Sequence, residues 1–295
     1  MFEIFGIPAT AFFGQLLIGL INGSFYATLS LGLAIIFGLL NIVNFAHGAQ
    51  FMLGGFAAWI LLTYCGIGFW PALILAPLIV GCIGIVLEKL MISRVYKLEH
   101  EYGLLLTLGL GLIIEGLMRQ LFGTASNTYP VPELLAGTVN LGFMFLPIYR
   151  LFVILAAVFI CVGTWLVIER TKLGAYLRAA KENPGLVRSF GINVPRLITL
   201  TYGAGAGLAA LAGVLAAPIY SVSPGMGVNL IIIVFAVVVI GGMGSILGSV
   251  VTGFGLGVAE GLTKIFYPEA ATTVIFIIMA LVLLVRPAGL FGRTV

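Results

Sequence analysis

Three polar side chains recur at every third position of an apolar stretch near the start of the chain. Asn44, His47 and Gln50 lie in the segment NIVNFAHGAQFMLGG, residues 41–55, and at this spacing they share one face of a helix. Amide and imidazole groups in such a segment either hydrogen-bond a neighbouring helix or line a path for a polar substrate. We favour the path for the segment as a whole, Asn41 included. For His47 itself we expect a structural hydrogen bond.

A second candidate for the path is a glycine-rich turn in the last third of the chain, Gly241-Gly242-Met243-Gly244-Ser245. The apolar arm before it, 229–241, has roughly 13 residues, fewer than the roughly 20 that cross a bilayer core. We therefore predict a broken or re-entrant hairpin with its second arm at 246–266. Irregular backbone at membrane depth needs water or protein to cover it, so we expect Gly241, Gly242, Gly244 and Ser245 to approach the path.

The longest polar segment, 169–196, predicts two short helices outside the membrane. The first carries an apolar stripe at i, i+3, i+4 and i+7. The stripe comprises Leu173, Tyr176, Leu177 and Ala180, and a basic rim comprises Arg178, Lys181 and Arg188. A second helix begins at Asn183-Pro184, since Asn caps helices and Pro fits the first helical position, and Gly191 can end it in a left-handed turn.

Helices this short are marginal in water, so the pair must rest on a surface. Two surfaces fit a stripe with a basic rim equally well. The pair could lie on lipid headgroups, or it could fit a groove on a soluble partner.

The chain lacks the residue sets of common enzymes. It has no Asp, only two histidines (His47 and His100), three scattered cysteines and no GxxxxGK[ST] motif. No Ser/His/Asp set, HExxH motif or metal-ligand spacing is present, and ATP cannot bind in the P-loop manner. We therefore assign no catalytic residue, no metal site and no cofactor of its own.

Two acids within apolar segments have a basic residue four positions later. These are Glu115 with Arg119 and Glu260 with Lys264, a spacing that suits ion pairs on one helix face. We interpret both as structural pairs near the ends of spans. A proton-coupled carrier would hold an unpaired acid near mid-span, and the sequence shows no such acid.

Composition places these segments in a membrane protein. The chain is 61% hydrophobic and only 8% charged, against about 25% charged residues in soluble domains. We expect an all-α polytopic fold of about eight spans, including broken or re-entrant helices. The expected spans are 12–37, 44–64, 70–92, 103–122, 150–168, 197–219, the broken pair 229–241 and 246–266, and 270–286. We expect them to form a single transmembrane domain, 1–295, in which 169–196 is a cytoplasmic loop.

Charge sets the expected orientation, because Lys and Arg concentrate in cytoplasmic loops. The basic loops are Arg94–Lys97, 169–196 and the tail with Arg286 and Arg293. The segments 123–149 and 220–228 then lie outside, as does the N-terminus, and the C-terminus lies inside.

Glycines crowd two of the spans, within 203–213 and 248–261. Small residues let helices approach closely in lipid. We expect tight packing within the monomer, with packing between subunits as the alternative.

Three separated motifs together resemble the permease subunits of branched-chain (hydrophobic) amino-acid ABC importers of the LIV type. They are LNIVNFAHGAQFMLGGF at 40–56, GAYLRAA at 174–180 with Gly191-Ile192 after it, and VIGGMGSILGSVVTGFGLGVAE at 239–260, followed by RPAGLFGR. The resemblance covers essentially the whole chain, and the motifs occur in the family's order.

This resemblance implies a set of partners in a bacterial inner membrane. The family's permeases pair around a central path, usually as two related but different subunits. Two cytoplasmic ATPase subunits bind the ATP, and a periplasmic binding protein delivers the amino acid. The coupling residues toward the ATPase would be Leu173, Gly174, Tyr176, Leu177, Arg178, Ala180, Lys181, Pro184 and Gly191. The general importer loop reads Glu-Ala-Ala, whereas this chain has Arg178-Ala179-Ala180, which leaves the docking register open.

The resemblance does not fix the substrate. Related permeases carry urea, short amides or aromatic acids, and the motifs do not separate these substrates. An ion-coupled secondary transporter, which is a different class, would also explain the broken helices. The sequence does not decide between an identical and a related partner permease, or whether this chain selects substrate at all.

Overall fold

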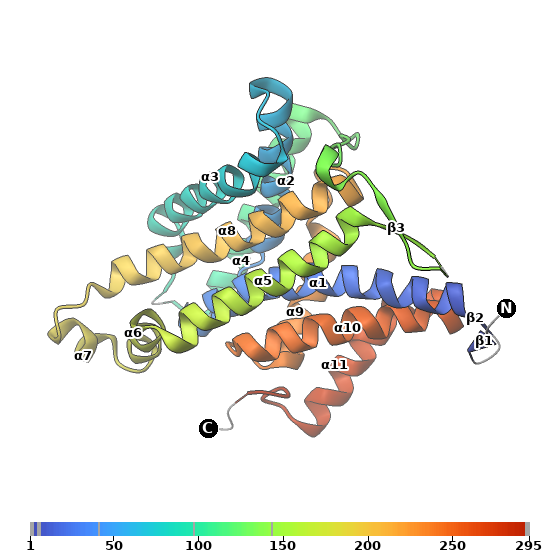
Figure 1. The fold of residues 1–295 in the computed structure, drawn as a ribbon. Helices are drawn as coiled ribbons and strands as arrows, with labels where there is room; N and C mark the ends of the chain where they lie inside the picture. Colours follow the sequence, from blue (N-terminus) through green and yellow to red (C-terminus); the bar gives the residue numbers. More distant parts are fainter. Residues whose placement is uncertain (1–2, 5–6, 41, 97, 143, 293–295) are drawn as a thin grey trace. The chain divides into compact units, whose positions relative to one another are not determined.

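Long apolar helices make up most of the chain in a computed structural model, which describes every residue except 1–2, 5–6, 41, 97, 143 and 293–295 (Figure 1). Among the described residues, seven helices are long and apolar enough to cross a membrane. They are α1 (Ala9–Leu40), α2 (Ala46–Cys65), α3 (Phe69–Leu90), α4 (His100–Phe122), α5 (Ile148–Arg170), α8 (Val194–Tyr220) and α10 (Ile246–Phe266).

Shorter elements connect these helices. Two further apolar helices are α9 (Val228–Gly241) and α11 (Thr273–Val285), and two polar ones are α6 (Lys172–Glu182) and α7 (Pro184–Ser189). Short 3₁₀ turns are η1 (Ile92–Arg94), η2 (Glu133–Leu135) and η3 (Pro268–Ala270). Two small antiparallel hairpins pair β1 (Glu3–Ile4) with β2 (Ile7–Pro8), and β3 (Thr138–Asn140) with β4 (Phe145–Pro147).

The predicted all-α polytopic fold is confirmed, and most predicted spans match a helix closely. The second arm of the broken pair, 246–266, coincides with α10, and the first arm ends with α9 at Gly241. The span expected at 270–286 is shorter, because η3 precedes α11. Asn41, Lys97 and Arg293 lie outside the described residues. The side of the membrane on which each terminus lies stays a prediction.

The chain separates into two compact units, and each is discontinuous in sequence. Unit 1 combines 1–30, 131–161 and 233–295, and unit 2 combines 31–130 and 162–232. The helices α1, α5 and α9 each contribute residues to both units. That 1–295 forms a single domain therefore stays a prediction.

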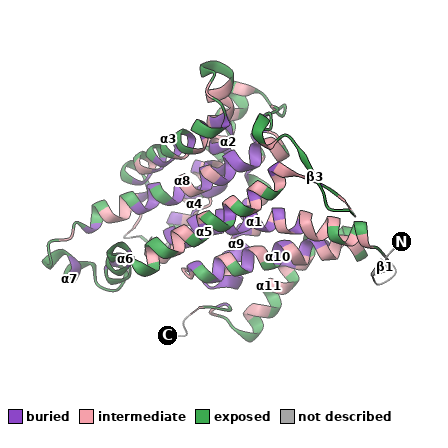
Figure 2. Cartoon of the chain, viewed as in Figure 1, coloured by how far each residue is buried: buried purple, intermediate pink, exposed green. Residues whose placement is uncertain are grey.

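In unit 2, α8 packs tightly against both α2 and α3 (Figure 1). Glycines make this approach possible, because a Cβ on Gly54 of α2 or on Gly213 of α8 would overlap the backbone of the other helix. Gly203 of α8 is similarly close to the carbonyl oxygen of Gly81 of α3, which lies 3.1 Å from an ideal Cβ position. The middle of α8 is correspondingly buried (Figure 2).

In unit 1, α10 packs against the first part of α1. A Cβ on Gly253 would lie 2.6 Å from the Ala27 Cα, and one on Gly261 would lie 2.9 Å from the Gly19 Cα. The predicted packing of glycines within the monomer is thus confirmed for these positions. It fails at Gly255, where a Cβ would meet nothing within 4 Å.

Replacing Gly54 by Ala tests the contact between α2 and α8. The added methyl would overlap the Ala210 backbone, which cannot move without shifting α8, and overpacking of this kind costs about 1–3 kcal/mol. Gly109→Ala in α4 is the control, because a Cβ there meets nothing within 4 Å and Ala favours a helix over Gly. We expect the thermal midpoint of the detergent-solubilised protein to fall for Gly54→Ala and to hold or rise for Gly109→Ala. Equal midpoints would contradict this packing.

Candidate functional site

The polar side chains near the start of α2 converge on one residue of α8, Tyr202. The Asn44 Nδ2 and the Gln50 Nε2 donate hydrogen bonds to the Tyr202 hydroxyl over 3.0 Å and 3.1 Å. The His47 Nδ1 lies 3.1 Å from the Gln50 Oε1. All four side chains are buried. They form a polar network (Asn44, His47, Gln50 and Tyr202) inside unit 2.

This network shows how the face of Asn44, His47 and Gln50 is packed within its own unit, and its approach to the path stays a prediction. Their side chains are buried and hydrogen-bond to Tyr202 or to one another, although the buried Asn44 Oδ1 has no hydrogen-bond partner among the described residues. The alternative, hydrogen bonding to a neighbouring helix, describes the arrangement, and His47 has the structural role expected of it. Asn41 lies outside the described residues.

The non-helical link between α1 and α2 is also covered from within unit 2. The Phe45 backbone N–H donates to the Thr107 hydroxyl of α4 over 3.2 Å, and that hydroxyl lies 3.1 Å from the Val43 carbonyl oxygen. Backbone groups freed by a helix break need such partners at membrane depth. The break therefore ties α2 to α4 as well as to α8.

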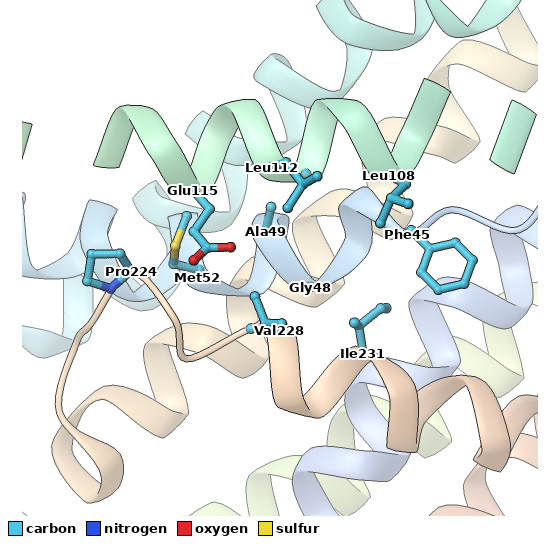
Figure 3. Close-up of a pocket in the computed structure, with 12 residues that line it drawn as sticks. Phe45, Gly48, Ala49, Met52, Leu108, Leu112, Glu115, Pro224, Val228 and Ile231 are labelled. Carbon is cyan, nitrogen blue, oxygen red and sulfur yellow. The ribbon is translucent and has the colours of Figure 1, made fainter. Parts of the chain in front are cut away.

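A pocket lies on another side of α2, between α4 and the segment that leads into α9 (Figure 3). It contains about 440 Å³ of empty space, part of it open to the outside. Its lining is apolar apart from one carboxylate. The pocket is lined by Phe45, Gly48, Ala49, Met52, Leu108, Gly111, Leu112, Glu115, Pro224, Gly227, Val228 and Ile231.

The carboxylate belongs to Glu115, which reaches from α4 into the pocket toward Met52 (Figure 3). Its Oε1 accepts a hydrogen bond from the Arg119 Nη2 over 2.6 Å, so the predicted i, i+4 pair is confirmed. The Glu115 side chain is 14% exposed and that of Arg119 is 56% exposed. Among the described residues, the second oxygen, Oε2, has no hydrogen-bond partner.

Two glycines form one wall of this pocket. A Cβ on Gly48 would lie 2.6 Å from the Gly227 carbonyl oxygen and 3.0 Å from the Ile231 Cβ. The backbone of α2 and the start of α9 therefore touch directly, and no side chain at these positions fills the space beside them.

The second predicted break, Gly241–Ser245, is covered by the C-terminal segment within unit 1. The Leu290 N–H donates to the Ile240 carbonyl over 2.8 Å, and the Phe291 N–H donates to the Gly241 carbonyl over 3.2 Å. Gly242 and Gly244 adopt φ values of 99° and 86°, a region that favours glycine. The Ser245 hydroxyl accepts from the Gly248 N–H and caps α10. That Gly241, Gly242, Gly244 and Ser245 approach the path stays a prediction.

The loop 169–196 folds into the two predicted helices, α6 and α7. The Asn183 side chain accepts from the Leu186 N–H over 2.9 Å, Pro184 occupies the first turn of α7, and Gly191 has a φ of 80°. Each of these local features follows the capping rules from which it was predicted.

The predicted apolar stripe of the loop, however, is divided between two environments. Leu177 and Ala180 are buried, and Ala180 packs in a cluster with Val187 and Val194 inside the loop. Leu173 and Tyr176 are exposed. The stripe is therefore not a single docking face, because half of it holds the loop together.

Two other predicted coupling residues also make contacts inside the loop region. A Cβ on Gly174 would overlap the Ile168 backbone, and the Arg178 guanidinium lies 3.3 Å from the Glu169 Oε2. Lys181 and Pro184 are exposed. The apolar side chains of α6, of α7 and of the residue after α7 that are exposed, and could therefore contact a partner, are Leu173, Tyr176, Leu186 and Phe190.

Sequence reasoning missed one buried acid, Glu88 in the last turn of α3. Its two oxygens accept hydrogen bonds from the Tyr96 and Thr199 hydroxyls, both over 2.6 Å. None of the ion pairs among the described residues involves it. Glu88 lies in the last turn of α3 and not near mid-span, so it does not contradict the expectation that no unpaired acid lies near the middle of a span. Burial, and then the hydrogen bond to Glu88, raise the pKa of Tyr96, so that hydroxyl keeps its proton.

The other predicted ion pair, Glu260 with Lys264, is confirmed, and Glu260 is buried. The Lys264 Nζ lies 2.6 Å from the Glu260 Oε1, and the Tyr26 hydroxyl donates to the Glu260 Oε2 over 2.7 Å. Glu260 therefore joins α10 to the first part of α1, which supports its structural interpretation.

Replacing Tyr202 by Phe tests the polar network. The change would leave the Asn44 and Gln50 amides without their acceptor in a buried site, at a cost of about 1–3 kcal/mol for each. Tyr64→Phe is the control, because Tyr64 is exposed near the end of α2. We expect the thermal midpoint to fall clearly for Tyr202→Phe alone. If the network contributes nothing to stability, both variants will have the thermal midpoint of the wild type.

Sequence similarity to known proteins assigns this chain to a family. The family model described as "Branched-chain amino acid transport system / permease component" matches residues 15–285. The permease BraD of a high-affinity branched-chain amino acid transport system from Pseudomonas aeruginosa is 31% identical, over 95% of each chain. The corresponding LivH protein from Salmonella typhimurium is 30% identical over 96% of each chain, and LivM from the same species is 28% identical over 91% of this chain and 68% of its own.

Among solved structures, PsaBC from Streptococcus pneumoniae in complex with Fab aligns with 91% of this chain and 89% of its own, at 15% identity and a TM-score of 0.46. That likeness is too weak to bear on the fold. The family model, in contrast, covers nearly the whole chain. The protein belongs to the family of branched-chain amino acid transport system permease components.

Proposed function

We propose that this chain is the membrane-spanning subunit of an ATP-driven ABC importer in a bacterial inner membrane. Its substrates are branched-chain or other hydrophobic amino acids, delivered by a periplasmic binding protein. The observation that carries this proposal is the family match over 15–285, together with relatives named as branched-chain amino acid permeases. The seven helices of the described residues that are long and apolar enough to cross a membrane, and the polar loop, agree with this role.

The second permease in the assembly is a related but different chain. Support comes from the relatives, because this chain resembles both LivH and LivM proteins, and it does so over most of its length. The similarity to LivH is the higher of the two and covers almost all of that protein, whereas LivM is the longer relative. We therefore assign this chain to the LivH position of a heterodimer.

The ATPase subunits dock on the loop formed by α6 and α7. Four apolar side chains of the loop are exposed: Leu173, Tyr176, Leu186 and Phe190. Exposed apolar anchors on short helices are a common means of filling a groove on a partner. A membrane-surface role would use the same side chains, and the first experiment below separates the two.

The loop has a packed core, so we expect it to move as a unit and not to bend. Ala180, Val187 and Val194 form its core, and Leu197 and Ile198 of α8 pack against that core. Farther along α8, Tyr202 holds Asn44 and Gln50. A displacement of the loop by an ATPase therefore passes along α8 to the start of α2, within one compact unit.

Replacing Phe190 by Ser tests the docking role. Phe190 is 77% exposed, so its loss leaves the loop core intact but removes an apolar anchor, which often costs a partner interface more than 1 kcal/mol. Phe145→Ser in β4 is the matched control, since that ring is 69% exposed and lies in the segment expected outside. We expect Phe190→Ser to lower both ATPase co-purification and ATP-driven leucine uptake, and Phe145→Ser to leave both unchanged.

The membrane-surface alternative predicts the opposite result for the first variant, namely normal ATPase recovery with at most a modest loss of uptake. Ala180→Glu would not separate the two hypotheses. Ala180 is buried in the core of the loop, so an unpaired charge there would disrupt the loop itself.

Orientation is tested by single cysteines in a background that lacks Cys65, Cys82 and Cys161. Leu134 of η2 and Glu182 of α6 are both exposed, and the Lys/Arg distribution places the first outside and the second inside. In intact spheroplasts, an impermeant maleimide should label Leu134→Cys at once and Glu182→Cys only after permeabilisation. Labelling of Glu182→Cys alone from the outside would overturn the proposed orientation.

A further inference from the structure

We propose that the pocket between α2, α4 and the start of α9 binds the amino acid during transport, and that the Glu115 carboxylate accepts the α-ammonium group of that substrate. This inference rests on the proposed function, because the family supplies the class of substrate. The pocket supplies the mode of recognition. It lies wholly within unit 2, so its geometry involves one compact body.

The walls of the pocket suit a branched aliphatic side chain. Phe45, Met52, Leu108, Leu112, Val228 and Ile231 present apolar groups from three segments of the chain (Figure 3). Burial of a leucine or valine side chain among such groups is favourable in proportion to the apolar area removed from water. The close approach of Gly48 to Gly227 keeps the space beside them free of side chains.

The Glu115 carboxylate distinguishes this pocket from an ordinary apolar gap between membrane helices. Its carboxylate points into the apolar space (Figure 3), and among the described residues its Oε2 has no partner. This oxygen is not fully buried, so it is open to a hydrogen-bond donor that enters the pocket. An ammonium group would supply up to three donors together with the opposite charge.

Arg119 supplies the positive charge that recognition of the substrate carboxylate requires. Its Nη2 is bound to the Glu115 Oε1, but a guanidinium has five N–H donors, and the Arg119 side chain is about half exposed. The free donors can receive the substrate carboxylate while Glu115 holds the ammonium. The pair and the amino acid are each neutral overall, so binding introduces no uncompensated charge into the membrane interior.

This arrangement selects among the substrates carried by related permeases. Urea and short amides carry no ammonium group, and neither do aromatic acids without an amine. None of them would satisfy the Glu115 carboxylate as well as an amino acid does. Sites that hydrogen-bond a substrate group discriminate strongly against analogues without it.

The test measures binding of radiolabelled L-leucine to the complete transporter in nanodiscs, without binding protein or nucleotide. The variants are Glu115→Gln, which removes the charge, and Ala49→Phe, which fills the pocket while Glu115 itself is unchanged. Glu101→Gln is the control, because Glu101 is an exposed acid in the first turn of the same helix. The competitor 4-methyl-2-oxopentanoate has the leucine side chain but no ammonium group.

We expect Glu115→Gln to weaken leucine binding by roughly tenfold or more, because a charge-assisted hydrogen bond is lost. Ala49→Phe should abolish binding, and Glu101→Gln should not change it. On the wild type, the oxo acid should compete at least roughly tenfold less well than leucine. This last comparison needs no variant, so it decides the question even if a substitution prevents assembly.

Three results would overturn the inference: equal competition by the oxo acid, normal leucine binding by both pocket variants, or no leucine binding by a wild-type complex that still takes up leucine with ATP and binding protein. Failure of the proposed function is distinct, because the wild-type complex would then import no branched-chain amino acid under any condition.

Discussion

Backbone groups at membrane depth must be covered, and this constraint explains how both helix breaks are built. In unit 2, the link before α2 is tied to Thr107 of α4. In unit 1, the carbonyls of Ile240 and Gly241 at the end of α9 accept hydrogen bonds from Leu290 and Phe291. In hydrocarbon each unsatisfied group would cost several kcal/mol. The closing segment RPAGLFG and the GGMGS turn, which look independent in the sequence, are therefore two halves of one structural feature.

The sequence predicts best what depends on neighbouring residues. The spans follow from local hydropathy, the start of α7 from the Asn183-Pro184 pair, and the ion pair of Glu115 with Arg119 from helical spacing. Each of these needs only a few adjacent residues to be decided. The two units, by contrast, each combine segments that are far apart in the chain. No local sequence pattern indicates which of these segments pack together.

The candidate site shows this limit clearly. Spacing placed His47 and Gln50 on one helix face, but nothing near them indicated Tyr202, which is more than 150 residues away and meets that face. Glu88 was overlooked because its partner hydroxyls lie on other segments. Ala180 was assigned to a partner because an apolar stripe does not say what covers it, and here half of the stripe is covered by the chain itself.

These tertiary contacts give α2 two different sides with two different tasks. On one side, His47 and Gln50 join the network around Tyr202 and fix the helix against α8. On another, Phe45, Ala49 and Met52 form a wall of the pocket that contains Glu115. Because α8 also carries the core of the α6–α7 loop at its first turn, a shift of that loop moves the helix against which α2 is held. If the pocket binds the substrate as proposed, the polar residues near the start of α2 influence transport without touching it, because they hold the helix that forms one wall of the pocket.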